Sequence, residues 1–93
     1  MHRFKEFHIR DQMMSGIRLY IDEGELPGNF LRAVICNDLR MAVGYADEGN
    51  LRNIPAFVDY FYNVAPKDCW GSEERMLAWI KYKNSERAAK EAG

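Results

Sequence analysis

The chain has 93 residues, 47% of them hydrophobic, which is enough for one small core and too few for a second domain with a site of its own. Thirteen Lys and Arg against 14 Asp and Glu give a net charge of −1, and this balance argues against a general affinity for nucleic acid or for an anionic membrane. No apolar run approaches the ~18 residues of a membrane span, and the start, MHRFKEF, lacks the apolar core of a signal peptide. We therefore expect one cytoplasmic domain over residues 1–93.

The first half of the chain predicts an arm followed by two helices. Residues 1–10 have mixed polarity without a clear period, which predicts a flexible arm or a short extended segment. A helix is expected over residues 11–23, where apolar residues recur at helical spacing and Gly24 supplies the stop. The pair Pro27-Gly28 precedes a second expected helix over residues 30–46. Its apolar stripe consists of Leu31, Val34, Ile35, Leu39, Ala42 and Ala46.

The second half predicts two further helices. Residues 47–53 read as a turn or a short irregular helix, and a third helix is expected over residues 55–65, which Pro66 closes. Ser72 is the expected cap of a fourth helix over residues 72–92, with a possible interruption at Asn84-Ser85 and a charged helical tail over residues 85–93. The fold class is therefore all-α, a small bundle or orthogonal array of about four helices.

Asp38 does not fit a simple amphipathic helix. On a helical wheel it falls inside the apolar arc of the second helix, where an unpaired carboxylate costs several kcal/mol. One interpretation is structural: Asp38 accepts hydrogen bonds from the backbone N–H groups of a neighbouring helix start or from a tyrosine hydroxyl. The other is functional: Asp38, with Asn37 and the helix start near Gly28, lines a pocket for a small, nucleotide-like ligand.

The third helix has an unusually wide apolar and aromatic arc. Only Asp59, Asn63 and the small Ala56 remain for a polar side, whereas a surface helix needs an apolar stripe of only about 100°. This pattern indicates either a central helix that packs on two sides or a helix that continues into a homodimer interface. The aromatic residues concerned are Phe57, Tyr60, Phe61 and Tyr62.

Trp70 stands in a polar loop just before the fourth helix. It can pack back over the core as a lid, because Gly71 lets the chain turn sharply before the cap. Alternatively it is an exposed anchor of the residue type that dominates binding hot spots. Together with Tyr60 and Tyr62 it supplies aromatic surface that a partner protein could contact.

The sequence does not favour catalysis. The only histidines, His2 and His8, lie in the expected arm, and Cys36 and Cys69 form no C-x-x-C pair, so we expect two reduced thiols, no catalytic residues, no metal and no cofactor. A DNA-binding regulator is the least favoured alternative. The second helix of a helix-turn-helix unit would be the aromatic segment over residues 50–63, which lacks the basic groups that a recognition helix needs.

Several short motifs resemble a family of small, uncharacterised proteins encoded by phages and prophages. They are PGNFL over residues 27–31, NDL over 37–39, AD over 46–47, YN over 62–63, Pro66, and CWGS over 69–72. The resemblance spans about residues 17 to 80.

The resemblance implies provenance rather than chemistry. It suggests a non-enzymatic phage accessory protein in the host cytoplasm that binds and modulates a host protein, as an inhibitor of a defence or takeover target. The alternatives are the nucleotide-like ligand module described above and, least favoured, the DNA-binding regulator.

Overall fold

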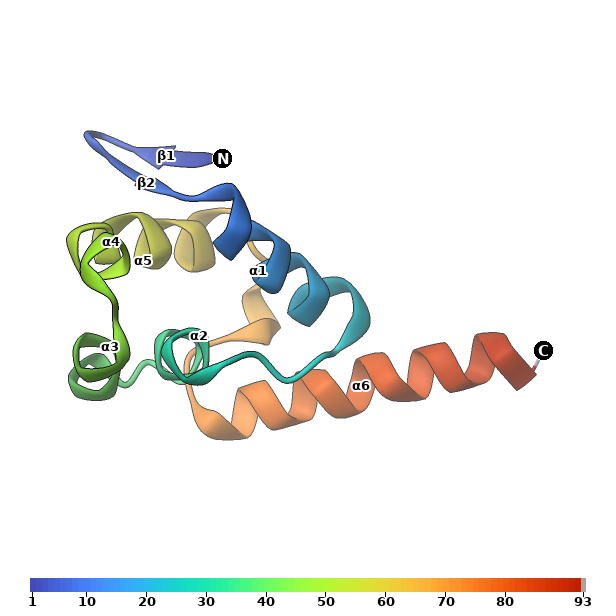
Figure 1. The fold of residues 1–93 in the computed structure, drawn as a ribbon. Coiled ribbons are helices and arrows are strands. Elements are labelled where there is room, and N and C mark those ends of the chain that lie inside the picture. Colours follow the sequence, from blue (N-terminus) through green and yellow to red (C-terminus); the bar gives the residue numbers. More distant parts are fainter. Residues whose placement is uncertain (93) are drawn as a thin grey trace.

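The structure is mostly helical, as the sequence predicts, but it also contains a small sheet (Figure 1). The computed structural model describes residues 1–92. Within these residues a two-stranded hairpin precedes six α-helices and one 3₁₀ turn, which corrects the expected all-α array of about four helices. The elements are β1 (His2–Phe4), β2 (Phe7–Ile9), α1 (Asp11–Glu23), α2 (Asn29–Ile35), α3 (Leu39–Tyr45), α4 (Glu48–Arg52), α5 (Ile54–Asn63), η1 (Lys67–Cys69) and α6 (Glu73–Ala92). No helix in this part of the chain combines the length and apolar character that crossing a membrane requires.

Residues 1–10 form a hairpin that packs on α5, not the flexible arm expected from their mixed polarity. The two strands are antiparallel, with His2 opposite Ile9, and Lys5 adopts a positive φ of 55° in the turn. Figure 1 shows the hairpin lying along α5. Ile9 is fully buried there, and His2 Nε2 lies 2.8 Å from the Asp59 carboxylate. The hairpin is therefore held by both apolar burial and a polar contact.

The core lies between α1, α2, α5 and the first turns of α6. Phe57 and Phe61 of α5 are buried, and the ring of Phe57 meets that of Phe30 edge to face at 5.0 Å. The core therefore covers the Phe57 and Phe61 face of this helix and the hairpin packs on another side, whereas Val58 and Tyr62 are exposed. The largest fully buried side chains are Tyr20, Phe57, Phe61, Ile9, Ile17, Ile35, Met76 and Cys69.

The single helix expected over residues 30–46 is two helices, α2 and α3, separated by a break. Asn37 takes a left-handed φ of 60°, and the N–H of Asp38 reaches back to the Ala33 carbonyl at 2.8 Å, which closes α2. The Asp38 carboxylate then accepts a hydrogen bond from the Met41 N–H at 3.1 Å and caps α3. Three residues, 36–38, therefore separate the end of α2 from the start of α3.

The break changes the faces that the helical wheel assigned. Asp38, expected inside the apolar arc, is exposed, and Leu39, expected on the buried stripe, is 66% exposed. Both expectations were wrong because a wheel holds only along one continuous helix. The Asp38 carboxylate accepts a hydrogen bond from the backbone N–H of Met41, at a helix start within the expected second helix and not at a neighbouring helix or a tyrosine hydroxyl.

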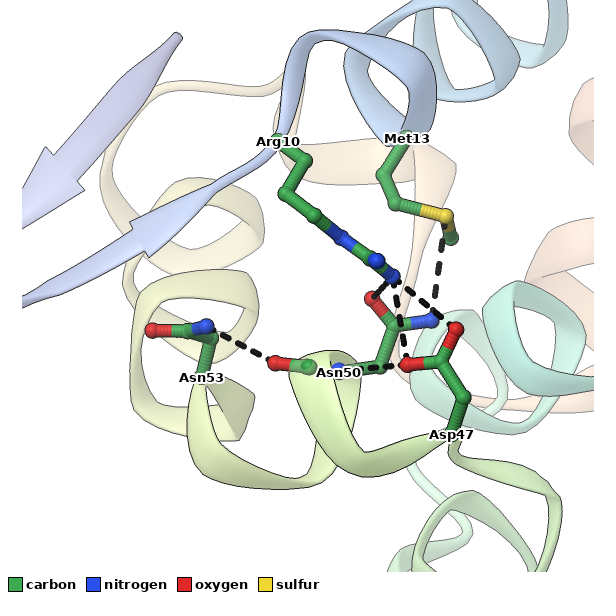
Figure 2. A network of polar contacts seen from close by, with 6 residues as sticks. Arg10, Met13, Asp47, Asn50 and Asn53 are labelled. Atoms are coloured by element: carbon green, nitrogen blue, oxygen red, sulfur yellow. Dashed lines mark hydrogen bonds and ion pairs between the residues drawn. The ribbon is translucent and has the colours of Figure 1, made fainter.

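A polar network joins the end of the hairpin to α4 (Figure 2). Asp47 caps α4 through the Asn50 N–H at 2.7 Å, and this bond and the Arg10 guanidinium hold the pKa of its carboxyl below the ordinary value. Arg10 Nη2 also donates to Asn50 Oδ1 at 2.9 Å, and the Asn50 amide contacts the sulfur of Met13 at 3.7 Å. Of the two expectations for residues 47–53, a turn or a short irregular helix, the structure has the helix, and this network ties it to the end of the hairpin.

α6 is one continuous helix, without the expected interruption at Asn84-Ser85. Its first turn is capped by the Ser72 hydroxyl, which accepts from the Arg75 N–H at 3.1 Å, and Trp79 Nε1 donates to the Ile21 carbonyl at 3.1 Å. Side-chain contacts three residues apart, such as Lys83 with Glu86 at 3.1 Å, support the helix where a break was expected. Figure 1 shows its C-terminal part extending beyond the other helices. Residue 93 of the expected tail lies outside the described residues.

Candidate functional site

The sequence singles out five candidate binding residues, and four of them lie on one side of the molecule. The five are Asn37, Asp38, Tyr60, Tyr62 and Trp70. Asn37, Asp38 and Trp70 line one hollow beside α5, and Asn37, Tyr62 and Trp70 line a second one next to it. The fifth, Tyr60, lies elsewhere. The structure thus brings residues from the α2–α3 break, from α5 and from the loop before α6 to a common surface.

The centre of this surface is the face of α5 that the core leaves uncovered. Ile54, Val58 and Tyr62 follow one another at intervals of four residues and therefore share one face of the helix. Val58 is 46% exposed and Tyr62 is 74% exposed. We call Ile54, Val58 and Tyr62, together with Leu39 and Trp70 at their side, the outer α5 surface. A hollow of about 430 Å³ continues it toward the hairpin.

Trp70 is half-buried and rigidly placed, so it combines features of the lid and of the exposed anchor. Its ring lies 6.2 Å from that of Phe61 in the core, at an interplanar angle of 35°, and 6.4 Å from that of Tyr62, at 89°. The Gly71 N–H donates to the Ile35 carbonyl at 2.7 Å and ties this loop to the end of α2. One side of the indole therefore contacts the core, and the indole also lines two surface hollows.

The second hollow, at the end of the outer α5 surface, is larger and bears positive charge. It has a volume of about 570 Å³. Lys67 comes from η1 and Arg75 from the first turn of α6, and the Arg75 side chain lies beside Gly71, where a Cβ would meet its Cδ at 3.3 Å. We call it the basic aromatic pocket. Its lining residues are Asn37, Tyr62, Ala65, Lys67, Trp70, Gly71 and Arg75.

Asn37 and Asp38 help to line a much smaller hollow. Its volume is about 40 Å³, and most of its other lining residues are apolar. Asp38 already uses its carboxylate to cap α3, and Asn37 stands at the left-handed position that ends α2. Both residues therefore have a structural role at the break between the two helices.

Tyr60 belongs to the contact between α5 and the hairpin. The centre of its ring lies 5.2 Å from that of His2 and 5.7 Å from that of Phe61, both edge to face. Burial raises the pKa of its hydroxyl. The neighbouring Asp59 accepts hydrogen bonds from Asn63 and from His2, both at 2.8 Å, which lower the pKa of its carboxyl. Tyr60 thus points toward the hairpin and not toward the outer α5 surface.

The two cysteines, Cys36 and Cys69, differ in their burial. Cys36 Sγ lies 3.8 Å from the sulfur of Met76, and Cys69 is fully buried, where burial raises the pKa of its thiol to about 11. Both cysteines are free. Within residues 1–92 no group of three or more His, Cys, Asp or Glu side chains is placed to hold a metal ion.

Sequence reasoning missed several residues of this site. Val58 belongs to the wide apolar arc of the third predicted helix, and the sequence does not show which side of that arc is exposed. Lys67 and Arg75 carry no usable signal, since they flank Trp70 in sequence but meet at a pocket only through the turn at Gly71. Leu39 was assigned to the core because the break before it was not foreseen.

Comparisons of the chain with protein-family models, with curated proteins and with solved structures give no match.

Proposed function

We propose that this chain is a non-enzymatic phage accessory protein that binds and modulates a host protein, as an inhibitor of a defence or takeover target in the host cytoplasm. The observation that carries the binding role is the outer α5 surface, which places Tyr62, 74% exposed, beside the half-buried Trp70. The phage and host parts of the proposal rest on the resemblance of the CWGS and related motifs.

The physical support for binding is the kind of surface that α5 leaves open. A large contiguous patch of exposed apolar side chains marks an interaction site, whereas single exposed apolar residues are common and need no explanation. Here Leu39, Val58 and Tyr62 are all exposed and lie around Trp70, whose position is fixed by contacts with the core. A rigid aromatic anchor loses little conformational entropy on binding, which is why tryptophan and tyrosine dominate hot spots.

The test is capture of a host protein by the tagged chain from bacterial lysate, with two matched variants. Tyr62→Ala removes the most exposed aromatic residue of the surface, whereas Tyr82→Ala removes a tyrosine on α6 that is 53% exposed and lies outside it. Both should fold normally, because substitutions at exposed sites change stability by only about 0.5 kcal/mol. A hot-spot tyrosine contributes ~2 kcal/mol or more, so Tyr62→Ala should weaken binding about 30-fold or more.

The proposal fails if the wild-type chain retains no protein, or if Tyr62→Ala and Tyr82→Ala retain it equally. The first result removes the partner, and the second removes the outer α5 surface as the binding site.

A homodimer through the third predicted helix would use little of the aromatic surface first assigned to it. Phe57 and Phe61 lie in the core and Tyr60 faces the hairpin, which leaves Tyr62 as the freely exposed member of the four. Sedimentation at tens of micromolar tests this proposal: a mass near that of one chain, 10.9 kDa, argues against the dimer.

The nucleotide alternative finds no single pocket at the place first assigned to it. Asn37 and Asp38 share only a hollow of about 40 Å³, and the hollow that Asp38 lines with Asn29, at the start of α2, measures about 260 Å³. Small-molecule sites usually measure about 300–1,000 Å³.

A further inference from the structure

The basic aromatic pocket is locally positive, whereas the chain as a whole is slightly negative. Its lining includes two cationic side chains, Lys67 and Arg75, and no carboxylate, although the chain as a whole has a net charge of −1. Within residues 1–92 neither cation forms an ion pair, as is also true of most Lys and Arg side chains in this part of the chain. Two positive charges in a pocket that no carboxylate lines, beside exposed apolar surface, favour an acidic partner.

The aromatic side of the pocket has a defined shape. The rings of Tyr62 and Trp70 stand at 89° to each other, with their centres 6.4 Å apart, so together they form a corner. An apolar side chain in such a corner contacts one ring by its face and the other by its edge. The pocket therefore combines an apolar seat with positive charge at its margin.

The pocket also continues into the hollows along α5. Tyr62 lines both it and the hollow toward the hairpin, and Trp70 lines both it and the hollow beside Leu39. The three hollows follow one helix face, marked by Val58 and Tyr62. A peptide segment with successive side chains can occupy this series, whereas a single small molecule would fill only one end of it.

We infer that the outer α5 surface and the basic aromatic pocket bind an acidic amphipathic segment of a protein partner. Apolar side chains of this segment lie over Val58 and in the corner of Tyr62 and Trp70, and its carboxylates reach Lys67 and Arg75. The inference rests on the proposed function and adds to it the chemistry of the partner segment.

The experiment uses two short synthetic peptides that differ only in charge. In the first, Leu and Phe alternate with Glu, and in the second each Glu is replaced by Lys. Binding to the full chain is followed by the NMR signal of the Trp70 indole N–H. We expect the acidic peptide to shift this signal and the basic peptide to leave it unchanged, with weaker binding at high salt because surface charges are screened.

Two charge-reversal variants distinguish an effect of the charge in the pocket from an effect of the net charge of the whole chain. Lys67→Glu/Arg75→Glu reverses the pocket, and Lys81→Glu/Lys90→Glu makes the same change on exposed residues of α6. The pocket variant should bind the acidic peptide about tenfold more weakly, from two surface charge pairs, and should now prefer the basic one. The α6 variant should retain the wild-type preference.

Several outcomes overturn the inference. They are no shift of the Trp70 signal at millimolar peptide, equal binding of both peptides, and equal weakening in the two variants. Binding of adenosine monophosphate at the Trp70 signal in place of the peptide would make the pocket a small-molecule site, and concentration-dependent self-association that Tyr62→Ala abolishes would make the occupant a second copy of the chain. If host-protein capture depends on Tyr62 but not on Lys67 and Arg75, the proposed function stands and this inference alone falls.

Discussion

Gly24→Ala is expected to destabilise the chain strongly, because two separate costs meet at this glycine. Gly24 ends α1 with a left-handed φ of 72°, and its N–H donates to the Tyr20 carbonyl at 3.0 Å. A residue with a Cβ in that conformation costs about 1–2 kcal/mol. The added Cβ would also lie 2.8 Å from the Cβ of Lys83 and 3.2 Å from the Ile80 carbonyl oxygen, and forcing α6 away costs about 1–3 kcal/mol more.

The sum, about 2–5 kcal/mol, is a large part of the ~5–14 kcal/mol expected for a domain of this length. The measurement is the free energy of unfolding from urea titration followed by circular dichroism. Gly44→Ala is the matched control: Gly44 lies inside α3, and a Cβ added there would meet no neighbouring part of the fold within 4 Å, so alanine should stabilise the chain by about 0.5–1 kcal/mol. A loss below about 1 kcal/mol for Gly24→Ala would refute the reasoning.

Three further predictions concern single polar or reactive groups. Tyr20→Phe should cost about 1–3 kcal/mol in urea titration, because the buried carbonyl of Cys69 loses the hydroxyl that donates to it; an unchanged midpoint would contradict this. The Cys69 thiol, with its pKa raised to about 11 by burial, should react with a thiol reagent only on unfolding, and mass spectrometry should find the other cysteine modified first. Hydrogen bonds from Asn63 and then His2 lower the pKa of Asp59, so their stabilising effect is present above about pH 4 and is lost as the pH falls toward the folded-state pKa; Asp59→Asn should therefore lose less stability than the wild type between pH 6 and pH 3, and parallel losses would count against it.

The long helices could be predicted from the sequence because their signals are local. The predicted helix over residues 11–23 matches α1 in both bounds, and those over 55–65 and 72–92 match α5 and α6 to within two residues. Apolar spacing, Pro55 near a helix start and the cap at Ser72 are readable without knowledge of the tertiary fold.

The hairpin could not be predicted, because its signals are too short. Each strand has three residues, and alternation over three residues does not exceed chance. The two-residue turn at Lys5-Glu6 also lacks the Asn-Gly or Asp-Gly pair that usually marks such a hairpin. Its strands gain stability from α5, on which they pack, and that contact is not visible in the sequence.

The break between α2 and α3 was available in the sequence but was outweighed by the apolar stripe. Asparagine is the residue other than glycine that most readily adopts the left-handed conformation, and aspartate is among the best helix caps. The pair Asn37-Asp38 therefore predicts a helix end followed by a helix start, whereas the helical wheel placed both residues in one continuous helix.

The candidate surface depends on which side of α5 is covered, and this is why it could be predicted only in part. Both sides of the helix are apolar, so the sequence alone does not distinguish Phe57 and Phe61 from Val58 and Tyr62. The hairpin and the core together cover one part of the helix, and Val58 and Tyr62 remain exposed. Trp70 then reaches this side because the Gly71 N–H bonds to the end of α2, a contact between distant parts of the chain that no local pattern encodes. A surface defined by such distant contacts becomes visible only in the folded chain.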